Sequence, residues 1–352
     1  MIEQSIPNEF TDLANVQASN QAELLDKEHV VGVALGHKVR GGEDTGERAL
    51  TVLVDAKLDG ELLADDDMVP DTLDGMPVDV KEVGTITAGP AVATRAPAEL
   101  RLDDMDEVAP QRNGYEVEAP QRIDIELLTG RVRPAMGGYS CGHPKVTAGT
   151  IATGCRPATP FPGIPSRYFL LSNNHVLANS NFAAIGDPTL QPGVADGGTV
   201  AADTIGRLAQ FVPIKYKTAT TAPLNYVDAA ISQVPFHLLN REIFYIGYVR
   251  RLYIAPKVGD ILQKTGRTTN YTTGRVTDIN ATLDVGGYVG GTARFARQIL
   301  TTAMSAGGDS GSLVTNLEEE GVGLLFAGSN SVTVMNHLHY VQAFLGVRIT
   351  EL

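Results

Sequence analysis

The sequence predicts a mainly β chain that begins with a small α+β unit. From about residue 135 onward, short β-branched runs alternate with Gly and Asn, and many short strands at such spacing are typical of an all-β barrel or sandwich. Before residue 84, a helix-like pattern precedes strand-like runs. We therefore predict an α+β unit over residues 1–84, a linker over 85–134 and a β domain over 135–352.

Four elements are expected in the first unit. Apolar residues at helix-like spacing predict a helix over 9–26. Strand-like runs follow at 30–38 and 48–58, with the glycine-rich segment 41–46 as the hairpin loop between them. A further strand is expected at 77–83.

The predicted linker and the predicted β domain differ in amino-acid composition. Prolines recur through residues 84–134 and exclude long helices there, so this segment is interpreted as a linker that wraps the surface. Beyond it, strands are expected at Tyr168–Ser172, Ile205–Val212, Val227–Val234, Ile261–Thr265, Thr273–Ile279 and Gly321–Gly328.

Charge and composition exclude several classes of partner. The net charge of −13 speaks against a nucleic acid. Residues 1–130 hold 28 acidic and 10 basic side chains, whereas the rest holds 13 and 18, so the two parts attract; this asymmetry is either solvated surface charge or a docking feature. No run approaches the roughly 18 apolar residues of a membrane helix. The first 25 residues lack the features of a secretory signal, and a cytoplasmic location is expected.

The two cysteines, Cys141 and Cys155, are too few for a disulfide framework. They are interpreted as buried thiols, with a bridge that closes a hairpin as the alternative. No metal site is expected at Cys141 and His143, because no second ligand pair follows at zinc spacing. The segment Asp65-Asp66-Asp67 lacks the other ligands of a calcium loop, and no cofactor is predicted.

Ser310 is the candidate nucleophile. It lies in Ser305-Ala306-Gly307-Gly308-Asp309-Ser310-Gly311-Ser312, which leads into an apolar strand. A serine hydroxyl requires a base in contact and donors for the oxyanion that it creates. The glycines allow a sharp turn that aims the N–H groups of Gly308 and Ser310 at one point, so these two amides are the candidate oxyanion hole.

His175 and Asp228 are the candidate base and its carboxylate partner. His175 follows the apolar run 169–171 and the polar Ser172-Asn173-Asn174, so it lies at the tip of a strand. Asp228 lies among apolar neighbours that would bury it, and a buried aspartate without a partner is costly. Such a carboxylate accepts the histidine N–H and stabilises the imidazolium.

The order His175, Asp228, Ser310 is that of chymotrypsin and differs from subtilisins and α/β-hydrolases. With the Gly-Asp-Ser-Gly motif at Ser310, residues from about 135 onward resemble the trypsin-like serine peptidases. This resemblance implies a double six-stranded antiparallel β-barrel of chymotrypsin type, with the active site between the barrels and a protein or peptide as the substrate.

A narrower resemblance extends over most of the chain. The sequence is similar to the narrow-leaf group of bacterial and plant trypsin-like proteins, whose members are intracellular peptidases or presumed peptidases, and some of them look oligomeric, so a homo-oligomer is an option here. The segments that carry it are Val30–Val33, Leu73–Gly75, Ala148–Thr150, Leu171–Asn181, Ile185–Asp187, Leu190–Gly193, Lys264–Thr269 and Gly323–Gly328.

The same resemblance implies substrate contacts. Met304, six residues before Ser310, would line the base of the primary pocket and favour apolar side chains, although it is equally interpretable as a core residue. Phe326, Ala327 and Gly328 would form the pocket wall and the strand on which a peptide pairs.

Two departures from secreted trypsins are visible. Val176 replaces the cysteine that follows the catalytic histidine, and no Ile-Val-Gly-Gly segment is present. Activation by a freed amino terminus is therefore not expected, and the oxyanion turn must be ordered in another way. Lys264-Thr265-Gly266 superficially resembles a phosphate loop but has the wrong spacing, and it is interpreted as a strand and turn.

Two functions are consistent with these residues. The first is a serine endopeptidase that acts through an acyl-enzyme. The second is a latent or inactive peptide-binding or scaffolding protein whose cleft is covered by the acidic amino-terminal part.

Overall fold

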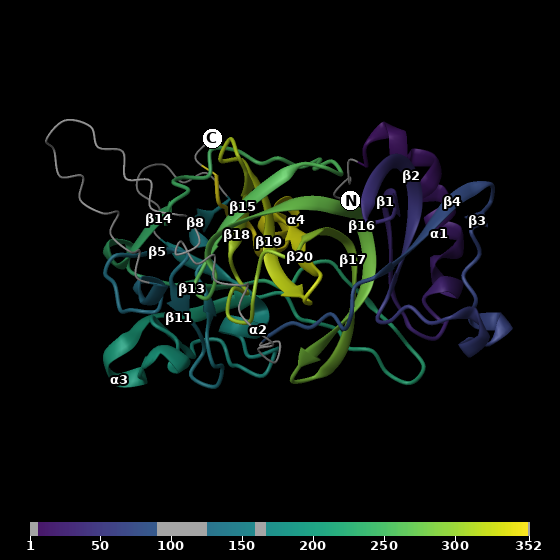
Figure 1. The fold of residues 1–352 in the computed structure, drawn as a ribbon. Coiled ribbons are helices and arrows are strands. Elements are labelled where there is room, and N and C mark those ends of the chain that lie inside the picture. Colours follow the sequence, from purple (N-terminus) through teal and green to yellow (C-terminus); the bar gives the residue numbers. More distant parts are fainter. Residues whose placement is uncertain (1–5, 90–124, 159–166, 351–352) are drawn as a thin grey trace, which may run out of the picture.

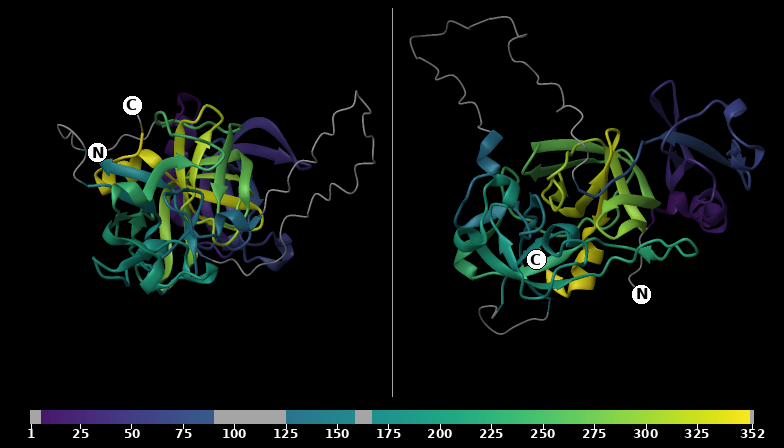
Figure 2. Two further views of the ribbon diagram at one scale, coloured as in Figure 1. Left: turned by 90° about the vertical axis from the view of Figure 1, so that its left-hand side faces the viewer. Right: turned by 90° about the horizontal axis from the view of Figure 1, so that it is seen from below.

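The computed structural model describes residues 6–89, 125–158 and 167–350. It is mainly β, as predicted, with a small α+β unit at the amino terminus. The strands form three groups along the chain: the sheet of the amino-terminal unit, and a first and a second β group within residues 135–352. Figures 1 and 2 show the second β group of the 135–352 region between the amino-terminal unit and the first β group.

The amino-terminal unit is one helix on a small sheet. Strand β2 pairs with β1 in antiparallel fashion and with β4 in parallel fashion, and β3 pairs with β4. The helix buries Leu13, Val16 and Leu24 against the sheet, which confirms the predicted spacing. The elements are α1 (Thr11–Leu24), β1 (Val30–Arg40), β2 (Glu43–Val54), β3 (Thr72–Leu73) and β4 (Met76–Glu82).

The first hairpin is tighter than predicted. The expected loop over 41–46 is only the pair Gly41-Gly42, and β2 already begins at Glu43. Both glycines have positive φ, +61° and +87°, which non-glycine residues adopt only with strain. The turn therefore needs two residues, and the polar residues after it extend the strand.

The first β group of the region 135–352 is a six-stranded sheet in the order β10-β11-β13-β9-β8-β21. Its strands are β8 (Thr153–Pro157), β9 (Phe169–Ser172), β10 (Pro188–Leu190), β11 (Thr204–Phe211), β13 (Ala230–Gln233) and β21 (Val347–Arg348). Other elements of this region are α2 (Asn174–Leu177), α3 (Val200–Asp203), β5 (Ala135–Gly137), β6 (Ser140–Cys141), β7 (Gly149–Thr150) and β14 (Leu239–Ile243). Strand β12 (Leu224–Asn225) pairs instead with a strand of the second β group.

The second β group also has six strands, and its pairings return to the starting strand through β15, β16, β17, β20, β19 and β18. The first group is a ladder with β10 and β21 at its ends. Closure of both groups into barrels stays a prediction. The elements are β15 (Ile261–Gly266), β16 (Asn270–Tyr288), β17 (Gly291–Thr302), β18 (Leu313–Asn316), β19 (Gly321–Gly328), β20 (Val332–His337) and α4 (Leu338–Leu345).

The amino-terminal sheet and the second group are continuous. Strand β1 pairs with the long strand β16 over Gly32 to Gly36, so both belong to one eleven-stranded sheet. Gly32 and Gly36 allow this approach, because a Cβ at either position would collide with β16. Only part of the predicted linker is described; residues 90–124 lie outside the described residues, and the domain boundaries stay predictions. In the described part of the chain, no helix is long and apolar enough to cross a membrane.

Candidate active site

Ser310 lies in a tight turn between the two β groups. Gly308 and Gly311 have φ values of +99° and +98°, so glycine is required on both sides of the serine. A Cβ at Gly311 would overlap Ser172 Oγ and Thr150 O of the first group. The turn is held there by a hydrogen bond of 2.8 Å from Thr150 N to Ser310 O.

His175 lies in the short helix α2, directly after strand β9, as the sequence predicted for a strand tip. The two asparagines before it fix the turn: Asn173 Nδ2 donates to Asp228 O at 2.7 Å, and Asn174 Nδ2 donates to Val212 O at 2.7 Å. Their amides explain why two small polar residues precede the histidine.

The imidazole is bound by Asp228. His175 Nδ1 and Asp228 Oδ2 are 2.6 Å apart, and the backbone N–H of His175 donates to Asp228 Oδ1 at 3.2 Å. The Asp228 side chain is fully buried, and that of His175 is 8% exposed. Two contacts to one residue fix both the position and the tautomer of the ring, because Nδ1 must carry the proton that the carboxylate accepts.

Tyr288, which the sequence analysis missed, completes the environment of Asp228. Its hydroxyl donates to Asp228 Oδ2 at 2.9 Å, and its ring lies edge-on to His175. Burial, followed by the nearby Asp228 charge, raises the pKa of Tyr288 well above its usual value, so the hydroxyl stays a donor. Asp228 is thus held by three donors, which is what a buried carboxylate requires.

Gly149 lies between the segments that carry His175 and Ser310. A Cβ there would overlap Val176 Cγ2 and would lie 3.0 Å from Ser310 O, so the glycine lets the segments of His175 and Ser310 approach. Within the described residues, His175 Nε2 is buried and has no hydrogen-bond partner. The bond from Ser310 to His175 is therefore not made in this structure; such bonds are often long without substrate.

The candidate oxyanion hole is built from Gly308 and Ser310. Thr150 Oγ1 donates to Gly308 O, and Thr268 Oγ1 donates to Gly307 O, both at 2.8 Å. The two carbonyls are thereby turned to the protein, and neither candidate amide donates a backbone hydrogen bond within the described residues. This arrangement leaves both N–H groups available for an anionic oxygen.

A buried ion pair orders this turn. Lys264 Nζ is 3.1 Å from Asp309 Oδ2, and both side chains are fully buried. Burial lowers the pKa of Lys264, and the Asp309 carboxylate opposes that effect. Asp309 also accepts from Thr268 N, Thr269 N, Thr269 Oγ1 and Ala306 N. Lys264 therefore supplies a buried positive charge that compensates the Asp309 carboxylate.

The segment Lys264–Thr269 is the strand and turn expected from the sequence, but its role was not foreseen. Gly266 is required there because a Cβ would overlap Asp309 Oδ1. Thr268 and Thr269 donate to the same carboxylate. The segment therefore surrounds the Asp309 carboxylate with hydrogen-bond donors.

The predicted substrate-binding residues separate into two sets. Ala327 and Gly328 line a cavity of about 30 Å³ together with Ser310 and the turn 305–307. Phe326 is fully buried and packs on Phe295, with ring centroids 4.7 Å apart. Met304 lies in the core cluster shared with the amino-terminal unit, and its sulfur faces Gly274. These contacts favour the core alternative for Met304, and a role in the pocket stays a prediction.

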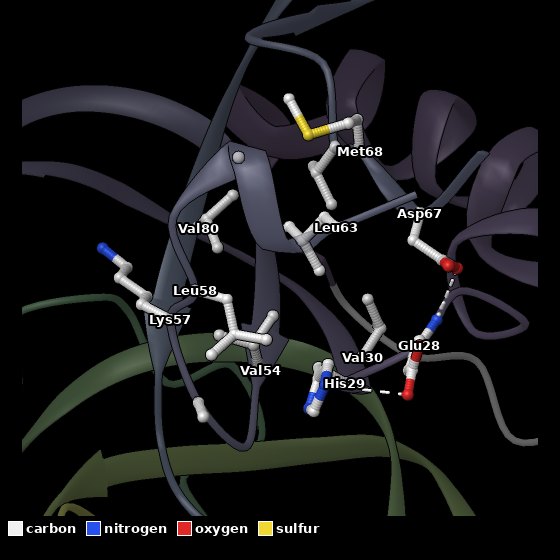
Figure 3. A pocket seen from close by; sticks show the side chains of 13 residues that line it. Glu28, His29, Val30, Val54, Lys57, Leu58, Leu63, Asp67, Met68 and Val80 are labelled. Atoms are coloured by element: carbon white, nitrogen blue, oxygen red, sulfur yellow. Dashed lines mark hydrogen bonds and ion pairs between the residues drawn. The ribbon is translucent and has the colours of Figure 1, made fainter. Parts of the chain in front are cut away.

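A larger cavity lies elsewhere, in the amino-terminal unit (Figure 3). It has a volume of about 260 Å³ and is lined largely by aliphatic side chains such as Val30, Leu63 and Val80. His29, at its rim, pairs with Asp55 at 2.8 Å. None of the lining residues belongs to the triad elements, so this cavity is separate from the candidate active site.

Both cysteines are free and fully buried, which confirms the interpretation as two thiols. Burial raises the pKa of Cys141 and of Cys155 to about 12. Neither is poised as a nucleophile, because the thiolate is the reactive form.

No family model matches this chain, and no curated protein matches it. Solved structures that are similar in fold include Protease A of Thermobifida fusca (14% identity, TM-score 0.43, covering 61% of this chain and 97% of that one) and a Nocardiopsis protease (15%, 0.42, 60% and 97%). A chymotrypsin of Cellulomonas bogoriensis is similar at 15% identity and a TM-score of 0.39, over 60% of this chain and 96% of that one. With TM-scores below 0.5, these likenesses leave function to be argued from the residues of this chain.

Proposed function

We propose that the protein is a serine endopeptidase that hydrolyses peptide bonds through an acyl-enzyme. The observation that carries the proposal is the imidazole of His175, bound through Nδ1 to the buried carboxylate of Asp228. The neighbouring Val176 and the carbonyl of Ser310 both face Gly149, which supports a site shared by the three residues. This is the arrangement that converts a hydroxyl into a nucleophile.

The chemistry assigns one role to each group. Ser310 Oγ attacks the substrate carbonyl while His175 Nε2 accepts its proton, and Asp228 stabilises the imidazolium. The N–H groups of Gly308 and Ser310 bind the oxyanion. His175 then protonates the leaving amine, the peptide C–N bond breaks, and water hydrolyses the Ser310 ester by the reverse proton path.

The test combines a variant with a covalent probe. Replacing Ser310 by Ala should lower turnover of peptide substrates by roughly 10⁴- to 10⁶-fold with folding intact. A fluorophosphonate should label the wild type at Ser310. The matched control is Ser331→Ala, an exposed serine outside the cavity, which should change neither result. Labelling at another residue, or none under any condition, contradicts the proposal.

The alternative is a peptide-binding protein without turnover. The missing hydrogen bond between Ser310 and His175 favours it, and the two functions separate by experiment. A binder retains peptide affinity in both the wild type and Ser310→Ala and is not labelled by the probe. A cytoplasmic location and a homo-oligomer stay predictions from the sequence.

A further inference from the structure

The segment Ile86–Gly89 lies where a peptide is expected to pair. Thr87 N donates to Gly328 O at 3.0 Å, and Gly328 N donates to Thr87 O at 3.1 Å. The two residues form an antiparallel bridge. Gly328 is one of the residues predicted to bind a peptide by its main chain, and both of its main-chain groups are occupied by Thr87.

The opposite edge of the segment is satisfied as well. Ala88 N donates to Gly286 O at 2.9 Å, and Gly286 N donates to Ile86 O at 3.0 Å. The next residue, Gly287, has φ +83°, and a Cβ there would lie 2.5 Å from Ala88 O. Thr87 thus forms isolated bridges to Gly328 of β19 and to Gly286 near the end of β16, and the backbone of the segment is paired on both sides.

Side-chain burial adds to these bonds. Ile86 and Ala88 are each 2% exposed and belong to one apolar cluster with Phe326 and Ala327. Thr87 and Gly89 line the cavity of about 30 Å³ beside Ser310. The segment therefore forms part of the wall of the cavity beside Ser310.

We propose that residues 86–89 are a built-in occupant of the substrate cleft, so that the chain inhibits itself in cis. This inference rests on the proposed peptidase function. A peptide that pairs with Gly328 requires the same N–H and C=O groups that Thr87 uses, and each pairs with one strand at a time. Substrate binding therefore requires the segment to leave, and the inhibition is competitive.

Two substitutions at one position separate backbone pairing from side-chain effects. Thr87→Pro removes the N–H that bonds Gly328 O, whereas Thr87→Ala keeps it. We expect Thr87→Pro to raise kcat/KM for a peptide substrate at least about fivefold, mainly through a lower KM, and Thr87→Ala to change it less than twofold. Equal kcat/KM in both variants and the wild type would overturn the proposal.

A second variant and a peptide added in trans keep the test independent of the stability of one protein. Ile86→Asp places a charge in the apolar cluster and should release the segment in the same way. A synthetic Val-Gly-Thr-Ile-Thr-Ala-Gly peptide, residues 83–89, should inhibit Thr87→Pro competitively, and the same peptide with Pro at position 87 should not. Failure of the first peptide to inhibit contradicts the proposal.

The fluorophosphonate separates the two hypotheses. If the wild type and Thr87→Pro are both labelled at Ser310 but turn over equally, the peptidase function holds and self-inhibition is wrong. If no variant is labelled and none cleaves peptides, the peptidase function itself is wrong. Added salt should not mimic Thr87→Pro, because uncharged main-chain bonds hold the segment.

Discussion

Replacing Lys264 by Met tests how the turn of Ser310 is ordered. The substitution keeps the length of the side chain and removes its charge, 3.1 Å from Asp309 Oδ2. At an effective dielectric constant of about 20, a charge pair at this distance is worth about 5 kcal/mol. Four other donors to Asp309 remain. We therefore expect unfolding to become easier by about 3–5 kcal/mol, the usual result of breaking a buried ion pair.

The same change should lower turnover. With Asp309 unpaired, the turn loses the contact that fixes the amides of Gly308 and Ser310, and loss of an oxyanion donor costs about 10²- to 10³-fold in kcat. The measurements are urea unfolding and steady-state kinetics. Lys81→Met is the matched control, since Lys81 Nζ is 2.7 Å from the buried Asp278 in the sheet away from the turn. It should lower stability and leave kcat unchanged.

The pH dependence gives an independent check. The pKa of Lys264 is lowered in the folded state, so as pH rises this lysine loses its proton before the unfolded chain does. The unfolded state then binds more protons, and the contribution of Lys264 to the free energy of unfolding rises with pH. Turnover, by contrast, should decline as pH rises, and the decline should begin before pH 10.5 is reached, because neutral Lys264 no longer pairs with Asp309. Wild-type kcat and stability in Lys264→Met would refute this reasoning.

Two further predictions concern buried groups. Tyr288→Phe removes one donor to Asp228 and should lower kcat/KM about 10- to 100-fold. Tyr216→Phe is the control, since it loses only a bond to Ser180 O and should leave kcat/KM unchanged. The same kcat/KM in Tyr288→Phe and the wild type would contradict the positioning role. A thiol reagent at pH 8 should label Cys141 and Cys155 only after unfolding, because their pKa of about 12 leaves almost no thiolate in the folded protein. Because the pKa of both thiols is raised by folding, their contribution to the free energy of unfolding is present below pH 9 and should decline toward pH 12.

The triad candidates could be chosen from sequence because each lies in a locally informative segment. His175 follows an apolar strand and two asparagines, and Ser310 is surrounded by glycines. Asp228 was selected because burial of a carboxylate requires a partner, and the structure places it against His175. In each case the chemistry of the residue restricts which residues can lie next to it in the sequence. A short segment is therefore enough to select it as a triad candidate.

Tyr288 and Lys264 could not be assigned in this way. They reach the site from β16 and β15, and no local pattern connects them with Asp228 or Asp309. One signal was present for Lys264, since it lies in a run that otherwise reads as a buried strand. A lysine at such a position requires an anionic partner. The partner itself is set by strand register, which the sequence does not state.

The contacts of residues 86–89 could not be predicted from the sequence. The recurring prolines of residues 84–134 indicated a linker, and the charge asymmetry was consistent with either solvated surface charge or docking. The observed contacts are main-chain hydrogen bonds of Thr87 and Ala88. Because every residue carries these main-chain groups, the composition of the segment does not predict such bonds. Among the described residues, Lys81 of β4 pairs with the buried Asp278 of the second group, and this ion pair is weakly screened because one partner is out of contact with solvent. Whatever frees the cleft must therefore compete for backbone pairing at Gly328, and an extended peptide is the ligand that can do so.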